Sequence, residues 1–203
     1  MNEKIQIMKV RKIEKGDLET RIKWMNDPRI FQHMGFTPPI TYENTLKWFE
    51  KNQNKDNRID LTYLDDNNNI IGFGGITEID WKLRNGEIYI FINPDLHGKG
   101  LGSKTFNLLL EIGFRKLKLN KLNSHIDASN IGSRKAHEKG GFKLEGILRD
   151  EKMLDGKYED RCYYGVLNKE YNPNNIIIDD ILIEDYPLKI VRDDVYPQTG
   201  GGG

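Results

Sequence analysis

The sequence predicts a mixed α/β fold organised around one strand–turn–helix unit. Residues 87–92 are rich in Ile, Tyr and Phe and are bounded by turn residues, which is typical of a buried strand. Gly98, Gly100 and Gly102 follow, and from Ser103 onward apolar residues recur at helical spacing opposite a polar face. The flanking segments also alternate between strand and helix patterns, so we expect one mixed sheet flanked by helices.

The elements expected before this unit follow from apolar spacing and from residues that break or cap helices. Asp27-Pro28 stops the first helix, Pro38-Pro39 is a break, and Thr41 can cap the next helix. Glycines in the strand just before the unit indicate a bulge or a close backbone approach. In order, the sequence predicts a strand over 7–13, a helix over 16–26, a loop or short helix over 29–37, a helix over 41–53 and a strand pair over 58–64 and 70–76.

After the central helix, the same patterns predict a β-α-β-β arrangement and then a separate tail. The expected elements are a strand over 121–126, a helix over 131–139 ended by Gly140-Gly141, and a strand pair over 142–148 and 158–167 joined at Asp155-Gly156. We therefore expect one domain over 1–171 and an extension over 172–203. Residues 176–191 of that extension fit an additional strand, and its glycine-rich end is expected to be disordered.

Composition excludes several classes of function. The 203 residues carry 31 basic and 31 acidic side chains, and a formal net charge of zero argues against a general nucleic-acid binder. From residue 172 onward six acids face two bases, a charge of 2 − 6 = −4, so the extension is acidic and the body mildly basic. Cys162 is the only cysteine, and no cluster resembles a metal site. Without a signal core or membrane-spanning run, a cytoplasmic protein is expected.

The glycine-rich turn carries the first functional prediction. Glycines between a strand and a helix N-terminus let backbone N–H groups approach an anion, and the helix dipole favours that anion. The expected cradle for a pyrophosphate consists of His97, Gly98, Lys99, Gly100, Leu101, Gly102 and Ser103. The spacing matches neither the P-loop nor the dinucleotide-binding fingerprint. A tight turn without a ligand is the alternative at this stage.

Three segments together resemble the GCN5-related N-acetyltransferase (GNAT) family over roughly residues 8–171. His97-Gly-Lys-Gly-Leu-Gly102 is similar to the family's Gln/Arg-x-x-Gly-x-Gly/Ala signature. Asn130-Ile-Gly-Ser133 with residues 138–146 is similar to its pantetheine-side helix and strand, and Asp155-Gly-Lys-Tyr158 to its closing hairpin. The branch most resembled holds ribosomal-protein, polyamine and amino-sugar N-acetyltransferases.

The resemblance implies a GNAT fold with splayed central strands and acetyl-CoA as co-substrate. The pyrophosphate would then lie on the 97–103 turn, and the pantetheine arm would pair with the central strand at Ile90, Phe91 and Ile92. Asn130 would bond the pantetheine amides, and Ser133 would contact the cofactor or merely cap its helix. Dimers are common in the family, so a homodimer stays open.

Two residues are the candidates for proton transfer. Glu87 opens the central strand where relatives often carry an acid, so we expect it to be the base or to orient a water; a salt-bridged strand-end carboxylate is the alternative. His137 falls where relatives place a tyrosine that protonates the leaving sulfur. It either replaces that tyrosine or is a surface helix residue. His33 and His125 are expected to be loop and strand residues rather than ligands.

The acceptor amine is expected between the N-terminal helices and the closing hairpin. Trp24, Asn26 and Phe31 form a candidate wall, since residues 24–28 resemble a Trp-x-Asn-x-Pro segment of acetyltransferases that act on amino-sugar nucleotides. The alternative places Trp24 and Phe31 in the core and makes residues 26–28 a helix stop.

The sequence therefore predicts an acetyl-CoA-dependent N-acetyltransferase in which a primary amine attacks the thioester directly. Its partner is expected to be a small-molecule amine, with an amino sugar or sugar nucleotide first, a protein N-terminus second and a polyamine third. A non-catalytic acyl-CoA-binding regulator stays open, because His97 and His137 depart from the family pattern.

Overall fold

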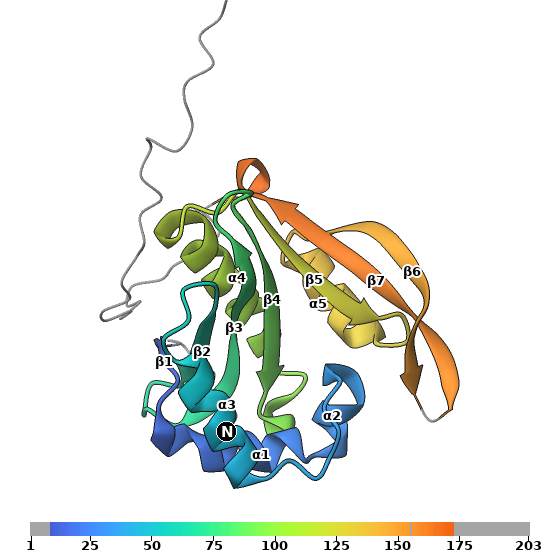
Figure 1. Ribbon diagram of the computed structural model, residues 1–203. Coiled ribbons are helices and arrows are strands. Elements are labelled where there is room, and N and C mark those ends of the chain that lie inside the picture. The colour runs from blue at the N-terminus through green and yellow to red at the C-terminus, as the bar shows by residue number, and fades with distance from the viewer. Residues whose placement is uncertain (1–8, 155, 173–203) are drawn as a thin grey trace, which may run out of the picture.

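The structure, a computed structural model, describes residues 9–154 and 156–172. Their strands form one seven-stranded sheet in the order β1-β2-β3-β4-β5-β7-β6, antiparallel except for the β4–β5 pair (Figure 1). The strands are β1 (Lys9–Lys12), β2 (Ile59–Leu64), β3 (Ile70–Asp80), β4 (Asn85–Ile92), β5 (Lys121–Asp127), β6 (Lys143–Leu154) and β7 (Lys157–Leu167). The helices are α1 (Leu18–Met25), α2 (Pro28–Met34), α3 (Tyr42–Asn52), α4 (Leu101–Leu110) and α5 (Ile131–Lys139).

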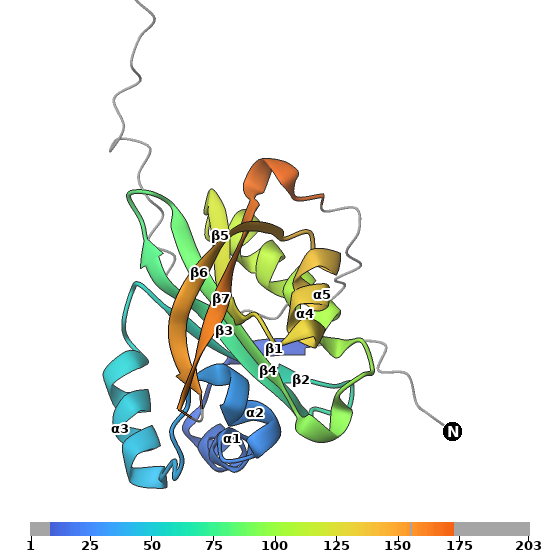
Figure 2. The same ribbon diagram turned by 90° about the vertical axis from the view of Figure 1, so that its right-hand side faces the viewer.

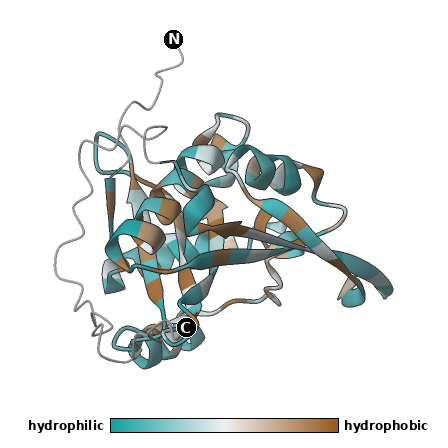
Figure 3. Ribbon diagram, turned by 90° about the horizontal axis from the view of Figure 1, so that it is seen from above, coloured by the Kyte–Doolittle hydropathy of each residue, from teal (hydrophilic) through white to brown (hydrophobic). Residues whose placement is uncertain are grey.

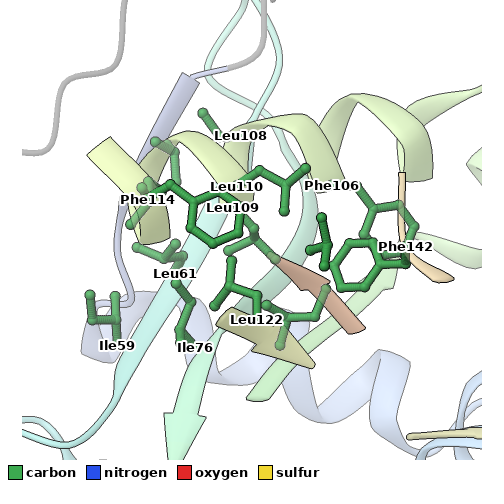
Figure 4. Close-up of a cluster of buried hydrophobic side chains, with 14 of the residues drawn as sticks. Ile59, Leu61, Ile76, Phe106, Leu108, Leu109, Leu110, Phe114, Leu122 and Phe142 are labelled. Atoms are coloured by element: carbon green, nitrogen blue, oxygen red, sulfur yellow. The ribbon is translucent and has the colours of Figure 1, made fainter. Parts of the chain in front are cut away.

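Helices cover both faces of the sheet. Figure 2 shows α4 and α5 on one side and α1 and α2 on the other. The larger core lies under α4, where Phe106, Leu109 and Phe114 pack against strand residues such as Leu61 and Leu122 (Figure 4). Full burial of such side chains stabilises the fold by roughly 1.5–3 kcal/mol each.

A second, smaller core lies on the opposite face. It joins Trp24, Met25 and Ile30 from α1 and α2 to Phe73 of β3 and Phe91 of β4. The Trp24 and Phe73 rings meet edge to face with centroids 5.4 Å apart, a favourable aromatic geometry. The N-terminal helices are thus fixed against the central strands.

The predicted α/β class and the element order before the tail are confirmed. Thr41 caps α3 through a hydrogen bond from the Asn44 amide, as expected. Residues 28–34 form a helix rather than a loop. The central helix starts at Leu101, two residues before the predicted Ser103, and continues into a π-helical segment, Glu111–Lys116. The predictions for residues 173–203 lie outside the described residues.

The one parallel strand pair, β4–β5, also has the fewest paired residues in the centre of the sheet. β4 pairs with β5 only where Asn85, Gly86 and Glu87 oppose Lys121, Leu122 and Asn123. Beyond Glu87, β4 stays paired with β3 and β5 stays paired with β7, while β4 and β5 diverge (Figure 1). Seen from above, the β6–β7 hairpin extends beyond the rest of the sheet on the β5 side (Figure 3). The splayed central strands expected from the family resemblance are therefore present.

Close packing of β2 on β3 yields a stability prediction. A Cβ at Gly75 would lie 2.0 Å from the Ile59 carbonyl oxygen, so Gly75→Ala must push two paired strands apart. We expect a loss of about 2 kcal/mol or more in the free energy of unfolding, measured by urea denaturation. Gly16→Ala is the matched control, since nothing lies within 4 Å of its Cβ position. Equal stabilities of the two variants would contradict the close approach.

Candidate active site

A cavity of about 990 Å³ lies where β4 and β5 diverge. Its lining comes from both strands, the 97–103 turn, α2, α4, α5 and the β6–β7 hairpin. All four histidines of the chain line it: His33, His97, His125 and His137. A site of this size with several titratable groups is typical of an enzyme that binds a small-molecule substrate.

Alternation along the two strands divides the cavity into two sides. On β4, Tyr89 and Phe91 pack with the α1–α2 cluster, whereas Ile90 and Ile92 pack with the α4–α5 core. On β5, His125 reaches Glu87 and Tyr163, whereas its neighbour Ser124 reaches His137 of α5. Because successive strand residues point to opposite faces, the two sides can hold different chemical groups.

The 97–103 turn has the backbone that an anion cradle needs. Gly98 and Gly100 have φ of +79° and +77°, which favours glycine, and open space surrounds both Cβ positions. Helix α4 begins at Leu101, and no side chain caps it. The N–H groups of the first turn are thus available to a phosphate at the dipole's positive end.

The residues of this turn differ in whether they line the cavity. Gly98, Gly100, Leu101, Gly102 and Ser103 line the cavity with His97. The His97 Nε2 atom lies 3.2 Å from the Ile92 carbonyl oxygen, so the ring is held to the end of β4. Lys99 is exposed and is outside the cavity lining. Its expected phosphate contact stays a prediction.

Asn130 and Ser133 mark the opposite wall at the start of α5. The Asn130 Oδ1 atom accepts a hydrogen bond from the Ser133 amide at 3.0 Å, so Asn130 caps the helix. Both residues line the same cavity as the start of α4. The residues present therefore fit an elongated cofactor with a pyrophosphate at one end.

Glu87 contacts a histidine rather than a lysine or arginine. Its Oε1 atom lies 2.9 Å from Nδ1 of His125, and both side chains are partly exposed to the cavity. A carboxylate only accepts hydrogen bonds, so Nδ1 carries a proton and, in the neutral ring, Nε2 keeps its lone pair. The His125 ring also packs on Tyr163, with centroids 4.8 Å apart. This pair can take up a proton at the point where the strands part.

His137 is buried, so the alternative that made it a surface residue is wrong. It is 5% exposed and surrounded by the rings of Phe106, Phe142 and Tyr164. Burial lowers the pKa of His137 to about 4, so the ring is neutral at pH 7.

The hydrogen bonds of the neutral His137 ring fix its tautomer. Nδ1 lies 2.8 Å from the Ser133 carbonyl oxygen, which can only accept, so Nδ1 carries the ring proton. Nε2 lies 3.1 Å from Ser124 Oγ and therefore accepts from that hydroxyl. In this arrangement neither nitrogen presents an N–H to the cavity, and the predicted role as proton donor lacks a donor atom.

Charged residues of both signs line the far end of the cavity. The buried Asp127 at the end of β5 contacts Lys152 Nζ at 2.5 Å and lies 3.6 Å from His33 Nδ1. Lys152 also donates to the Gln32 carbonyl, which ties the hairpin to α2. Arg161 faces Asp127 across the β5–β7 pair, and its buried Nε has no partner among the described residues.

The three residues expected to form the acceptor wall are not among the residues that line the cavity. Trp24 is 6% exposed in the second core, and Phe31 is partly buried on α2. The Asn26 amide accepts from the Ile40 amide at 2.8 Å and donates to its carbonyl at 2.9 Å. The contacts of Trp24 and Asn26 match the core-and-helix-stop alternative, whereas Phe31 belongs to neither core cluster of the described residues. Direct substrate contact by the three stays a prediction.

A family model agrees with this arrangement. Residues 8–143 match the acetyltransferase (GNAT) domain. The chain belongs to the GNAT family. That its splayed strands and glycine-rich turn hold acetyl-CoA stays a prediction, with which the observed geometry agrees.

Individual relatives support the same assignment. The spermidine N(1)-acetyltransferase of Vibrio cholerae is 26% identical over 162 residues, which cover 80% of this chain and 94% of the relative. The putative ribosomal N-acetyltransferase YdaF of Bacillus subtilis is 30% identical over 102 residues, covering 50% of this chain and 56% of the relative. A crystal structure of V. cholerae spermidine N-acetyltransferase with CoA and spermine has a TM-score of 0.78, covering 80% of this chain and 96% of that one.

These findings establish a GNAT-type N-acetyltransferase that uses acetyl-CoA as co-substrate. Over residues 9–154 and 156–172, no helix is long and apolar enough to cross a membrane. The same residues contain no group of three or more His, Cys, Asp or Glu side chains placed to hold a metal ion.

Sequence reasoning missed Ser124, His125 and Asp127 as site residues. The signal was present, because Asn123, His125 and Asp127 place polar side chains at alternate positions of one strand. A buried strand next to the central one rarely carries such a row unless that face borders a site. The pairing of His125 with Glu87 needed the β4–β5 register as well.

The buried His137 ring should make stability depend on pH. Its pKa in the folded protein, about 4, lies below the unfolded value of about 6.5, so protons bind preferentially to the unfolded chain between these values. Stability should therefore fall as pH drops from 6.5 to 4, with about 3 kcal/mol lost through this one residue. Urea denaturation of wild type and His137→Phe across this range measures the effect. Parallel pH profiles for the two proteins would contradict the neutral assignment.

Proposed function

We propose that this enzyme acetylates a primary amine and that the Glu87–His125 pair removes the proton from that amine. The observation that carries the proposal is the 2.9 Å contact between these side chains, at the mouth of the β4–β5 splay. An amine that is protonated at pH 7 must lose a proton before it can attack a thioester. A carboxylate-oriented imidazole or the carboxylate itself, directly or through a water, is a suitable acceptor.

The chain's other groups serve binding and orientation. The 97–103 turn and the start of α5 hold the co-substrate at its two ends, with the β4 backbone between them. The Tyr163 ring supports His125 from the β7 side, and Asn123 donates to the Tyr163 hydroxyl at 2.6 Å. Acetyl-CoA supplies the activated acyl group, and the protein supplies proximity and a proton acceptor.

Charge in the cavity favours an acceptor with one amine and a neutral or anionic body. Among the described lining residues the carboxylates are Glu87, Asp127 and Glu151, and the Lys and Arg side chains are Arg29, Lys152 and Arg161. The three carboxylates are balanced by three cationic side chains, so no surplus of negative charge remains to bind several ammonium groups. The unpartnered Nε of Arg161 instead favours an oxygen-rich group. An amino sugar or its nucleotide combines one amine with such groups.

A polyamine is the second candidate. Three relatives are named spermidine N(1)-acetyltransferases, one from V. cholerae at 26% identity and two from Escherichia coli strains at 31% identity. A polyamine would require Asp127 to leave Lys152 or a further carboxylate to reach the cavity. Protein N-termini, the third candidate, are supported by the name of the B. subtilis relative alone.

Removing the proposed base should slow turnover while leaving the co-substrate site intact. We expect Glu87→Gln to lower kcat by roughly 10²–10⁴-fold, because the amide is a poor proton acceptor and also loses the charge that orients His125. CoA binding by calorimetry should be unchanged. Glu43→Gln on the exposed face of α3 is the control carboxylate. Full turnover by Glu87→Gln would refute the role of the pair.

Thiol release from acetyl-CoA identifies the acceptor. We expect release with amino sugars or sugar nucleotides to exceed release with spermidine and with ribosomal N-terminal peptides. Asp127→Asn should then lower thiol release with spermidine more than thiol release with the preferred sugar, because only the polyamine needs that negative charge. If thiol release were faster with spermidine and were abolished in Asp127→Asn, the acceptor would be a polyamine instead.

A further inference from the structure

We propose that the Ser124 hydroxyl hydrogen-bonds the departing CoA sulfur and that His137 acts as a positioning residue that holds this hydroxyl. Ser124 lies on β5, 6% exposed, with its Oγ 3.1 Å from His137 Nε2. Both side chains line the same cavity as the glycine-rich turn. The inference rests on acetyl-CoA being the donor and is independent of the acceptor's identity.

The position of Ser124 follows from strand alternation. Ser124 and His125 are consecutive on β5, and their side chains lie on opposite faces. His125 faces Glu87, where the amine must lose its proton, and Ser124 faces α5 on the co-substrate side. A thioester carbon between the two strands would therefore gain its C–N bond on one side and lose its C–S bond on the other.

The tautomer of His137 makes the hydroxyl responsive to charge. Nε2 accepts the Ser124 hydroxyl hydrogen while the thioester is intact. As the C–S bond breaks, its electron pair stays on sulfur, and a thiolate attracts the hydroxyl hydrogen more strongly than a neutral imidazole does. The hydroxyl hydrogen then turns toward the sulfur. Because this hydrogen bond forms only as negative charge develops on the sulfur, it stabilises the transition state more than the bound substrate and lowers the barrier to C–S cleavage.

The reaction balances without a proton from Ser124 or His137. The protonated amine loses one proton before attack and a second as the C–N bond forms, and both pass through the Glu87–His125 pair to solvent. The C–S bond breaks, and the sulfur leaves as a thiolate stabilised by the hydroxyl. The thiolate takes one proton from water after release, so one net proton goes to solvent. His137, held by the Ser133 carbonyl and three aromatic rings, stays neutral throughout.

The pKa of the thiol in bound CoA tests the proposal directly. We titrate the enzyme–CoA complex and follow the thiolate by its ultraviolet absorbance, with desulfo-CoA as the blank. In Ser124→Ala the pKa of the bound thiol should rise by roughly one unit relative to wild type, because the thiolate loses a donor. Its kcat should fall by roughly 10- to 100-fold at unchanged KM for acetyl-CoA.

Two further variants separate this role from packing. Ser124→Thr keeps the hydroxyl and should restore both the thiol pKa and kcat. His137→Phe fits the aromatic surroundings and removes the acceptor that competes with the sulfur for the hydroxyl hydrogen. It should therefore lower the thiol pKa, so the test survives if Ser124→Ala does not fold. An unchanged thiol pKa in Ser124→Ala or His137→Phe, with CoA bound, would overturn the proposal even if turnover falls. If Glu87→Gln loses turnover while the pKa of the bound thiol stays normal, that result tests the proposed base and not the role of Ser124.

Discussion

The limited pairing of β4 with β5 is the constraint on which the rest of the structure depends. Three residue pairs hold the strands together at one end, and the neighbouring strands β3 and β7 keep each of them in the sheet beyond that point. Backbone groups on the facing edges are therefore left for a ligand, since buried polar groups require partners. Residues at the starts of α4 and α5 both line this opening, and only α4 lacks a side-chain cap, so the slot has one helix N-terminus open to an anion.

Strand alternation turns this opening into two chemical compartments. Glu87 and His125 lie on the face of α1 and α2, where an amine can approach, and Ser124 and His137 lie on the face of α4 and α5. The environments differ accordingly. The first pair is partly exposed and can exchange protons with solvent, whereas burial lowers the pKa of His137 and holds it neutral. In the proposed mechanism, bond making and bond breaking are thus served by groups of different polarity.

The fold and the conformation of the glycine-rich turn were predictable from the sequence because they depend on local signals. Glycines at φ near +78° before a helix, and a buried strand before them, are encoded within about 20 residues. The proton-transfer groups depend instead on which residues meet across the sheet. Glu87 was found by its position, but its partner His125 lies 38 residues away and required the parallel register. The tautomer of His137 likewise depends on Ser124 and the Ser133 carbonyl, which no periodicity reveals.

A buried positive charge behind the proposed acceptor side affects which amines can bind there. Arg21 of α1 is 4% exposed, with its guanidinium 4.6–5.8 Å from the ring centroids of Trp48, Phe91, Phe73 and Tyr89. Tyr89 and Phe91 line the cavity, so this charge lies directly behind its wall. Asp60, which accepts from Tyr89, is already paired with Arg58. Among the described residues Arg21 contacts aromatic rings rather than a carboxylate, and its positive potential disfavours a second ammonium group near this wall. An acceptor with a single amine would avoid that repulsion, which agrees with the proposal drawn from the balanced charges of the cavity lining.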